Sequence, residues 1–175
     1  MEKRQSGLSF RVMSLMFRVR DLVRPRKDIL IDAVIGTGAH VLDFGCGPGG
    51  YLLPLARLVG PSGRIHALDM NPAAVETVKG VIAKHSLANV DTILSDGPTG
   101  LPDASLDFVL AYDVFHHLTQ PERVQAEWRR VLNPAGILSV TDHHLEESEI
   151  IAGVTASGYF KLSRKGKKVF NFSSV

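Results

Sequence analysis

One short apolar segment ends in an acid and leads into a run of glycines, a combination that could hold a nucleotide-like ligand. The segment spans residues 41–44 and carries Asp43, and the following turn supplies Gly45, Gly47 and Gly49 before a leucine-rich stretch begins. A strand that enters a helix through glycines places backbone N–H groups and the positive helix end at one spot. Many α/β folds bind nucleotides there. This turn is therefore the first candidate binding site.

The same glycines match a dinucleotide-binding fingerprint, so the type of ligand has to be decided on other grounds. Gly45, Gly47 and Gly50 have the required spacing, and Asp69 follows nineteen residues after the last of them. Asp43, however, would repel a pyrophosphate and would instead suit a cationic ligand. We also expect 175 residues to be too few for a separate substrate domain. Both features argue against a dehydrogenase.

A second group of residues could move a proton. It follows two later apolar segments, 107–112 and 137–141, and consists of Asp113, His116, His117, Asp142, His143 and His144. Parallel strands end at the same edge of a sheet, so we expect the four histidines to converge if these segments are neighbours. An imidazole there could serve as a general base. Adjacent histidines rarely bind one ion together and no metal-ligand spacing is visible, so we predict no metal site.

Composition describes an ordinary globular protein of one domain. The chain has 175 residues, of which 45% are hydrophobic and 22% charged, and its one cysteine cannot form an internal disulfide. No apolar run approaches the roughly 20 residues that span a bilayer. Arginines interrupt the apolar residues near the N-terminus, which argues against a signal peptide. We therefore expect a cytoplasmic protein, monomeric or homodimeric, with no transmembrane segment.

The net charge of +2 conceals an uneven distribution. Residues 1–28 and 159–175 each carry a net charge of +5, and the middle of the chain carries −8. Basic ends could attract an anionic partner such as RNA or a membrane surface. A solvated surface with an ordinary basic helix is the plainer interpretation, and the sequence leaves both open.

Apolar periodicity predicts helices and strands in alternation. An amphipathic helix is predicted over residues 7–24 and a second helix over 28–35. The predicted strands are 40–44, 64–69, 90–94, 107–112, 137–141, 159–163 and 169–174, the last two joined as an antiparallel hairpin. The predicted helices between them begin near Leu52, at Asn71-Pro72, at Pro121 and near Glu146. This order indicates an α/β fold, a doubly wound and mostly parallel sheet with helices on both faces.

Several segments together resemble the class I S-adenosylmethionine-dependent methyltransferases, most closely their UbiE-like type 11 group. The similarity covers roughly residues 38–142, with motifs in 41–49, 67–70, 95–97, 108–118 and 130–138. The resemblance implies a Rossmann-like sheet of seven strands whose antiparallel end is the C-terminal hairpin. It implies one methyltransferase domain over 1–175, with a cofactor-binding core over 38–142 and a helix and hairpin over 143–175. Residues 1–36 would form a helical segment that could act as a lid.

The resemblance also assigns roles in binding S-adenosylmethionine. Asp43 would face the positively charged methionine end, and Asp69 would accept hydrogen bonds from the ribose hydroxyls. Asp96 would accept the adenine amino group. The other cofactor-binding residues that it implies are Gly45, Cys46, Gly47 and Gly49 in the loop, Met70 and Gly97 near the adenine, and Asp113 after the fourth strand. For Asp69 and Asp96, a structural role as turn formers is the alternative.

The resemblance further implies in-line transfer of the methyl group to a small-molecule acceptor. The chain lacks the Asn/Asp-Pro-Pro-aromatic motif of amino-group nucleic-acid methylases, and its single cysteine suits neither cytosine nor arsenite methylation. His116, His117 and His143 are the candidate catalytic residues, with a structural role as the alternative for each. Two other functions stay open. One is an RNA methyltransferase that uses the basic ends, and the other is a non-catalytic subunit that binds the cofactor.

Overall fold

The computed structural model describes residues 26–175. The amphipathic helix predicted over 7–24, and the lid function suggested for it, lie outside the described residues. Within residues 26–175, no helix is both long enough and apolar enough to cross a membrane.

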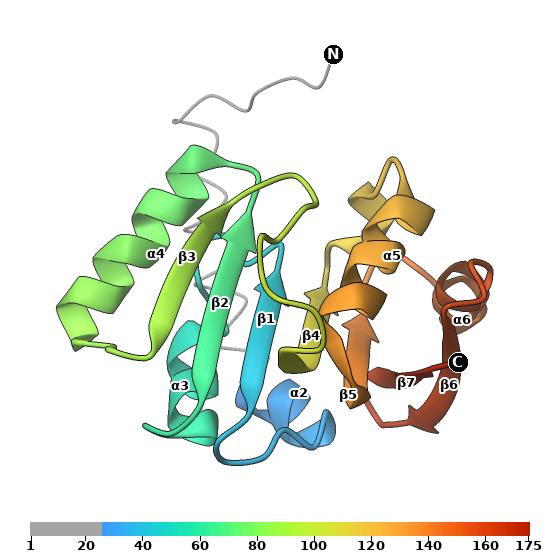
Figure 1. The fold of residues 1–175 in the computed structure, drawn as a ribbon, viewed down its shortest axis with the longest axis horizontal. Coiled ribbons are helices and arrows are strands. Elements are labelled where there is room, and N and C mark those ends of the chain that lie inside the picture. Colours follow the sequence, from blue (N-terminus) through green and yellow to red (C-terminus); the bar gives the residue numbers. More distant parts are fainter. Residues whose placement is uncertain (1–25) are drawn as a thin grey trace.

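Among the described residues, seven strands form one sheet, in which the first five strands run parallel (Figure 1). Their order across the sheet is β3-β2-β1-β4-β5-β7-β6. The strands are β1 His40–Phe44, β2 Arg64–Asp69, β3 Val90–Leu94, β4 Leu106–Tyr112, β5 Leu132–Thr141, β6 Phe160–Lys165 and β7 Phe170–Ser174. β7 is antiparallel to both β5 and β6. The predicted doubly wound, mostly parallel sheet with an antiparallel C-terminal hairpin is confirmed.

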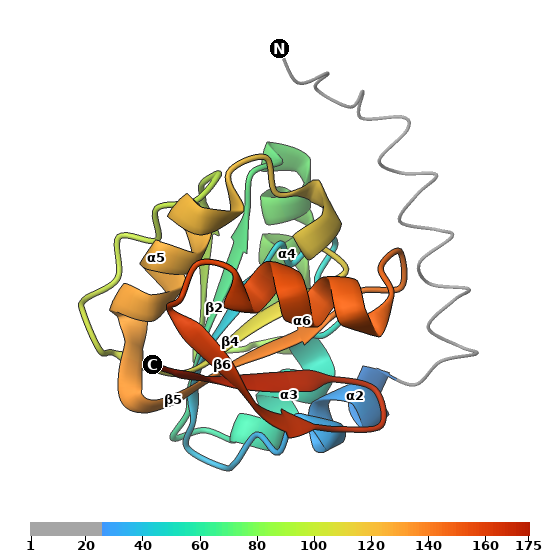
Figure 2. The same ribbon diagram turned by 90° about the vertical axis from the view of Figure 1, so that its right-hand side faces the viewer.

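Within the same part of the chain, five α-helices cover the two faces of this sheet (Figures 1 and 2). They are α2 Arg26–Asp32, α3 Leu52–Val59, α4 Pro72–His85, α5 Pro121–Val131 and α6 Glu147–Thr155. α2, α3 and α4 contribute to the apolar cluster on one face, and α5 and α6 to the cluster on the other. A short 3-10 helix, η1 Phe115–His117, follows β4.

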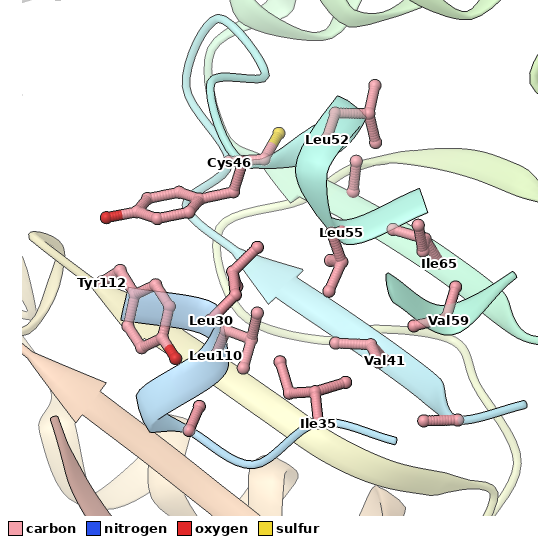
Figure 3. Packing of buried hydrophobic residues seen from close by; sticks show 14 of the residues in the cluster. Leu30, Ile35, Val41, Cys46, Leu52, Leu55, Val59, Ile65, Leu110 and Tyr112 are labelled. Carbon is pink, nitrogen blue, oxygen red and sulfur yellow. The ribbon is translucent and has the colours of Figure 1, made fainter. Parts of the chain in front are cut away.

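The central strand β1 shows why helices are needed on both faces. Val41 lies in one cluster with Leu30 of α2 and Leu55 of α3 (Figure 3). Phe44 faces the opposite side, where its ring meets Trp128 of α5 edge to face with the ring centroids 5.2 Å apart. A parallel strand that is apolar on both faces has to be covered on both. The carboxyl ends of the strands are the edge left for a ligand.

Two helices begin close behind these carboxyl ends, and both starts are capped. Asn71 accepts a hydrogen bond of 3.0 Å from the N–H of Ala73, and Pro72 is the first residue of α4, as the sequence predicts. α6 begins with a capping box in which the side chains of Glu146 and Glu149 each accept from the other's backbone N–H. The caps hold the loops after β2 and β5 in place.

The fifth strand begins earlier than predicted. Asn133–Gly136 reads as a turn between a helix and a strand, but β5 starts at Leu132, directly after α5. Leu132 pairs with Leu106 of β4, and the register of the ladder then shifts. The amide of Asn133 donates to Asp107 at 2.7 Å and holds the irregular segment against β4. A turn-like sequence therefore forms a bulge here, because the neighbouring strand supplies the partner.

Two other boundaries also differ from the prediction. The helix predicted over 28–35 is α2, and Val34 beyond it has a φ of 65°, which an α-helix cannot include. The hairpin is present, but its connection lies at residues 166–169, because the first strand ends at Lys165 and not at residue 163 as predicted.

Candidate active site

The predicted site residues fall on both sides of the point where the strand order reverses. From β1 the chain continues through β2 and β3 toward one edge of the sheet, and β4 and β5 lie on the other side of β1. In doubly wound sheets the ligand crevice forms at such a point, beyond the carboxyl ends of the strands. One group of candidates therefore belongs to β1, β2 and β3, and the other to β4 and β5.

Asp43 lies near the end of β1 and has only 2% of its surface exposed. Among residues 26–175, its Oδ2 has no hydrogen-bond partner. Burial raises the pKa of this carboxyl to about 7, an effect that the charge of Arg26 opposes and the charge of Asp69 reinforces. A buried carboxylate is costly unless a cation or a donor reaches it. Asp43 is therefore suited to hold a positively charged group.

The glycine loop has left-handed backbone, with φ values of 76°, 52° and 79° at Gly45, Gly47 and Gly49. A Cβ on Gly45 would lie 2.6 Å from Cγ2 of Val114, so this position has no space for a side chain. A Cβ on Gly47 would meet no atom within 4 Å, so the backbone there is open to a ligand. The N–H groups of Gly45 and Cys46 both donate to the carbonyl of Leu68, at 2.8 and 2.9 Å, and fix the loop to β2.

Cys46 is poorly suited to act as a nucleophile. Its surface is 5% exposed, and burial, with the nearby charges of Asp43 and Asp69, raises the pKa of its thiol. A thiol that resists ionisation is a poor nucleophile. The side chain fills space within the cluster on the α3 face (Figure 3).

Asp69 links the glycine loop to the start of α4. Its Oδ2 accepts the N–H of Gly47 and its Oδ1 accepts the N–H of Asn71, each at 2.8 Å. Asp69 thus has the turn-forming role that the sequence left as an alternative. Each carboxylate oxygen can accept more than one hydrogen bond. The two hydrogen bonds that Asp69 accepts therefore leave its oxygens able to accept further bonds from the hydroxyls of a ligand.

The third acid, Asp96, is exposed in the loop after β3, and the N–H of Gly97 beside it donates to Oγ of Ser95 at 3.2 Å. Two large apolar side chains lie at the same edge, Met70 with 54% and Leu94 with 57% of their surface exposed. Exposed apolar side chains beside a polar loop suit a flat heteroaromatic ring. Leu94 was not identified from the sequence, because the last residue of an apolar strand looks like core.

Arg26 at the start of α2 is a further residue that the sequence did not single out. Its guanidinium carbon lies 4.6 Å from the centroid of the Tyr51 ring. Its Nη1 fills the space beside Gly50, only 1.9 Å from where a Cβ on that glycine would be. The arginine therefore brings a positive charge to the glycine loop, where it could bind a carboxylate. In the sequence it is one of many basic residues near the N-terminus.

On the other side of the reversal, the four histidines converge as expected. β4 and β5 are parallel neighbours, and the segments that follow them lie side by side. The ring centroids are 3.9 Å apart for His116 and His117, 4.3 Å for His116 and His144, and 3.8 Å for His143 and His144. Two aspartates lie beneath this stack of imidazoles.

Asp142 holds His116 in one orientation. Its side chain is fully buried, and Oδ2 lies 2.7 Å from Nδ1 of His116 and accepts the His116 backbone N–H at 3.1 Å. Oδ1 accepts the N–H of His144 at 3.0 Å. Burial opposes ionisation, but these hydrogen bonds outweigh it and keep the pKa of Asp142 below its ordinary value. An ionised Asp142 favours a proton on Nδ1 of His116, which leaves Nε2 as the basic nitrogen.

Asp113 and His143 form a similar but more exposed pair. Oδ1 of Asp113 lies 2.7 Å from Nδ1 of His143 and accepts its backbone N–H at 3.2 Å. The φ of Asp113 is 54°, uncommon outside glycine, and its N–H donates to the carbonyl of Thr141 at 2.8 Å. Asp113 therefore contacts the histidine group here, and its suggested part in cofactor binding stays a prediction.

The strand order and the glycine loop are those of the class I S-adenosylmethionine-dependent methyltransferase fold. The chain belongs to the methyltransferase domain family, whose model matches residues 35–169. A solved structure of an S-adenosylmethionine-dependent methyltransferase from Aquifex aeolicus superposes with a TM-score of 0.75 at 23% identity, covering 90% of this chain and 96% of the other. At that identity the match supports the fold.

Two curated relatives each match part of the chain. A protein of 37.1 kDa in a transposon of Streptomyces fradiae, uncharacterized, is 38% identical over 120 residues, and the aklanonic acid methyltransferase of a Streptomyces strain is 31% identical over 106 residues. The matches cover 67% and 60% of this chain. The chain spans 34% and 48% of the length of these relatives.

Proposed function

We propose that this chain transfers a methyl group from S-adenosylmethionine to a small-molecule acceptor. The observation that carries the proposal is the buried carboxylate of Asp43, with an oxygen that lacks a partner among the described residues, beside an open glycine loop. The ammonium and sulfonium of the methionine end are the cations that such a carboxylate suits. The similarity to aklanonic acid methyltransferase supports a small-molecule acceptor.

The order of the three acids along the sheet would fix the orientation of the bound cofactor. Asp43 on β1 would hold the methionine end, Asp69 after β2 the ribose, and Asp96 after β3 the adenine amino group. Met70 and Leu94 would flank the adenine, and Arg26 would bind the methionine carboxylate. With the adenine and ribose on the side of β3 and β2, the methyl group would lie toward β4, the other neighbour of β1. The acceptor would then lie over the ends of β4 and β5.

The residues that follow β4 and β5 supply a base that could take a proton from the acceptor. S-adenosylmethionine, when bound, supplies an electrophilic methyl group on a sulfonium. The protein has to align the acceptor with that methyl and exclude water. His116, whose Nδ1 is held by the buried Asp142, presents Nε2 to take a proton from the acceptor. His117 lies against His116 and would support its orientation.

Methylation of RNA through the basic ends is less well supported. Within the described residues, three of the basic side chains of the C-terminal hairpin already pair with acids of this chain. These pairs are Arg164 with Asp32, Lys165 with Glu147 and Lys168 with Asp28. Paired cations have less charge to offer a phosphate backbone. Steep loss of RNA binding with added salt would be the result that favours this alternative.

Calorimetry with S-adenosylmethionine and with S-adenosylhomocysteine tests the cofactor site. We expect binding of both, with the affinity for S-adenosylmethionine lowered at least tenfold in Asp43→Asn, because a contact between charges is lost. Glu122→Gln, an exposed acid at the start of α5, is the control and should bind as wild type does. If neither compound binds at millimolar concentration, the proposed function is wrong.

A screen with a methyl-labelled donor tests the transfer and identifies the acceptor. His116→Gln should lower the rate of labelling by 10²-fold or more while cofactor affinity changes little. His85→Gln, an exposed histidine at the end of α4, is the matched control. A chain that binds cofactor but labels no acceptor would instead be a non-catalytic cofactor-binding subunit.

A cytoplasmic location, a single domain over 1–175 and a monomeric or homodimeric state belong to the same proposal.

A further inference from the structure

Three side chains at the ends of β4 and β5 bring potential metal ligands together. Asp113, Asp142 and His143 each offer one ligand atom, and these atoms all lie within 4.8 Å of one another. Two of the atoms are carboxylate oxygens and the third is an imidazole nitrogen. Metal–ligand bonds of about 2.1 Å place neighbouring ligand atoms roughly 3 to 4 Å apart. The three side chains would therefore need only a small movement to close on one ion.

The surroundings of these side chains are those of a site with an open side. The Asp142 side chain is fully buried, the Asp113 side chain is 24% exposed, and that of His143 is 42% exposed. The buried carboxylate is anchored by two backbone N–H groups, that of His144 in its own loop and that of His116 in the segment after β4. Exposure increases across the three ligands toward solvent, so further coordination positions would be filled from outside. Metal centres that bind a substrate keep such positions open.

Both carboxylates already contact imidazoles at hydrogen-bond distance. Nδ1 of His143 lies 2.7 Å from Oδ1 of Asp113, a nitrogen and an oxygen that could both be ligands. Nδ1 of His116 lies equally close to Oδ2 of Asp142. A divalent cation could replace the contact between Asp113 and His143, while His116 stays as the outer partner that orients Asp142. Hydrogen-bonded carboxylates are the usual arrangement around metal sites.

We propose that Asp113, Asp142 and His143 bind a divalent transition-metal cation at the ends of β4 and β5. Mixed oxygen and nitrogen ligands suit Mn²⁺, Co²⁺ or Zn²⁺ better than Ca²⁺. The part that concerns the acceptor rests on the proposed function. There the cation would bind the acceptor's hydroxyl or enol oxygen and make the loss of its proton to Nε2 of His116 easier. The oxygen would then form the new O–CH3 bond as the S–CH3 bond breaks and S-adenosylhomocysteine leaves. The acceptor would then be a small molecule that is methylated on a hydroxyl or enol oxygen.

The site is missing from the sequence prediction for a physical reason. Its ligands come from two loops separated along the chain, and only His143 and Asp142 are adjacent. The spacing along the sequence therefore resembles no metal motif. The parallel pairing of β4 with β5 brings the two loops together.

Metal binding is tested without cofactor or acceptor, on protein first treated with EDTA and then dialysed. Mn²⁺ is titrated and free Mn²⁺ is followed by electron paramagnetic resonance. We expect one site per chain in wild type, weakened at least tenfold in His143→Gln and in Asp142→Asn. His144→Gln is the matched control, because it removes the neighbouring, similarly exposed imidazole that is not among the ligands. Its affinity should stay within about twofold of wild type.

Several results would overturn the metal site. Absence of a stoichiometric site in wild type would do so, and so would equal weakening by His143→Gln and His144→Gln, which would indicate non-specific binding to the histidine stack. His143 is exposed, so its substitution should leave folding intact, and circular dichroism checks this. Binding of Mn²⁺ by a chain that does not bind S-adenosylmethionine would support the metal site and refute the proposed function. Transfer to a hydroxyl acceptor that persists at full rate in EDTA would refute the role in the reaction.

Discussion

Replacing Asp43 with asparagine should make the cofactor-free protein more stable and at the same time impair cofactor binding. Asp43 is buried, and burial raises its pKa from 3.8 to about 7. Each pH unit of such a difference corresponds to about 1.4 kcal/mol. Keeping this carboxylate ionised at pH 8 therefore costs the folded state on the order of 4 kcal/mol relative to the unfolded chain. Asparagine has nearly the same shape and removes that cost.

The stabilisation of the cofactor-free protein by Asp43→Asn should increase with pH. The folded chain binds the Asp43 proton more tightly than the unfolded chain does, so wild type loses stability as the pH rises from about 4 to about 7. Below about 4 the residue is protonated in both states and its contribution disappears. Burying an amide without a full set of partners costs about 1–3 kcal/mol. We therefore expect a net stabilisation by Asp43→Asn of about 2 kcal/mol at pH 8, falling toward zero or below at pH 4.

Urea unfolding of both proteins at pH 4, 6 and 8 gives the two free energies directly. For the exposed control Glu122→Gln, the difference in unfolding free energy from wild type should change little between pH 4 and pH 8. Calorimetry on the same samples should show weaker binding of S-adenosylmethionine by Asp43→Asn. A difference in unfolding free energy that is independent of pH would show that Asp43 is not held at a raised pKa. The assignment of the buried carboxylate as a cation site would then lose its physical basis.

Further substitutions test the packing of the glycine loop, ligand binding and one ion pair. Gly45→Ala should destabilise the fold by about 2 kcal/mol or more through its φ of 76° and the contact at 2.6 Å with Val114, and Val114→Ala should restore part of this in urea unfolding. Gly47→Ala should cost only about 1 kcal/mol of stability, because its Cβ meets no atom within 4 Å, yet should weaken cofactor binding measured by calorimetry. A side-chain hydrogen bond from an arginine lowers the pKa of Glu127 to about 2, so its stabilisation is present above pH 4.5 and lost toward pH 2. In Glu127→Gln, the free energy of unfolding measured from denaturation curves should fall less between pH 4.5 and pH 2 than in wild type.

Features set by neighbouring residues could be predicted from the sequence. The apolar run of β1 and the glycines after it specify a strand and a left-handed turn within ten residues, and Asn71 and Pro72 specify a helix start. The bulge at Asn133–Gly136 could not be predicted in the same way, because the segment becomes part of a strand only when β4 lies beside it. Arg26 reaches the glycine loop through tertiary contacts that no local pattern shows. Local structure could be predicted from local residues, whereas a contact between distant segments could be predicted only where it follows from strand pairing, as for the four histidines.

The register between β4 and β5 is as much a part of the acceptor side as the histidines themselves. Tyr112 lies opposite Thr141, and Asp113 and Asp142 are the residues that follow. A slip of one residue would turn every side chain of a strand to the other face of the sheet, which would separate the two carboxylates. The buried pair of Tyr112 and Ser139, with their hydroxyl oxygens 3.0 Å apart, opposes such a slip from inside the core. Changes at this pair should therefore disturb metal binding and the orientation of the histidines together.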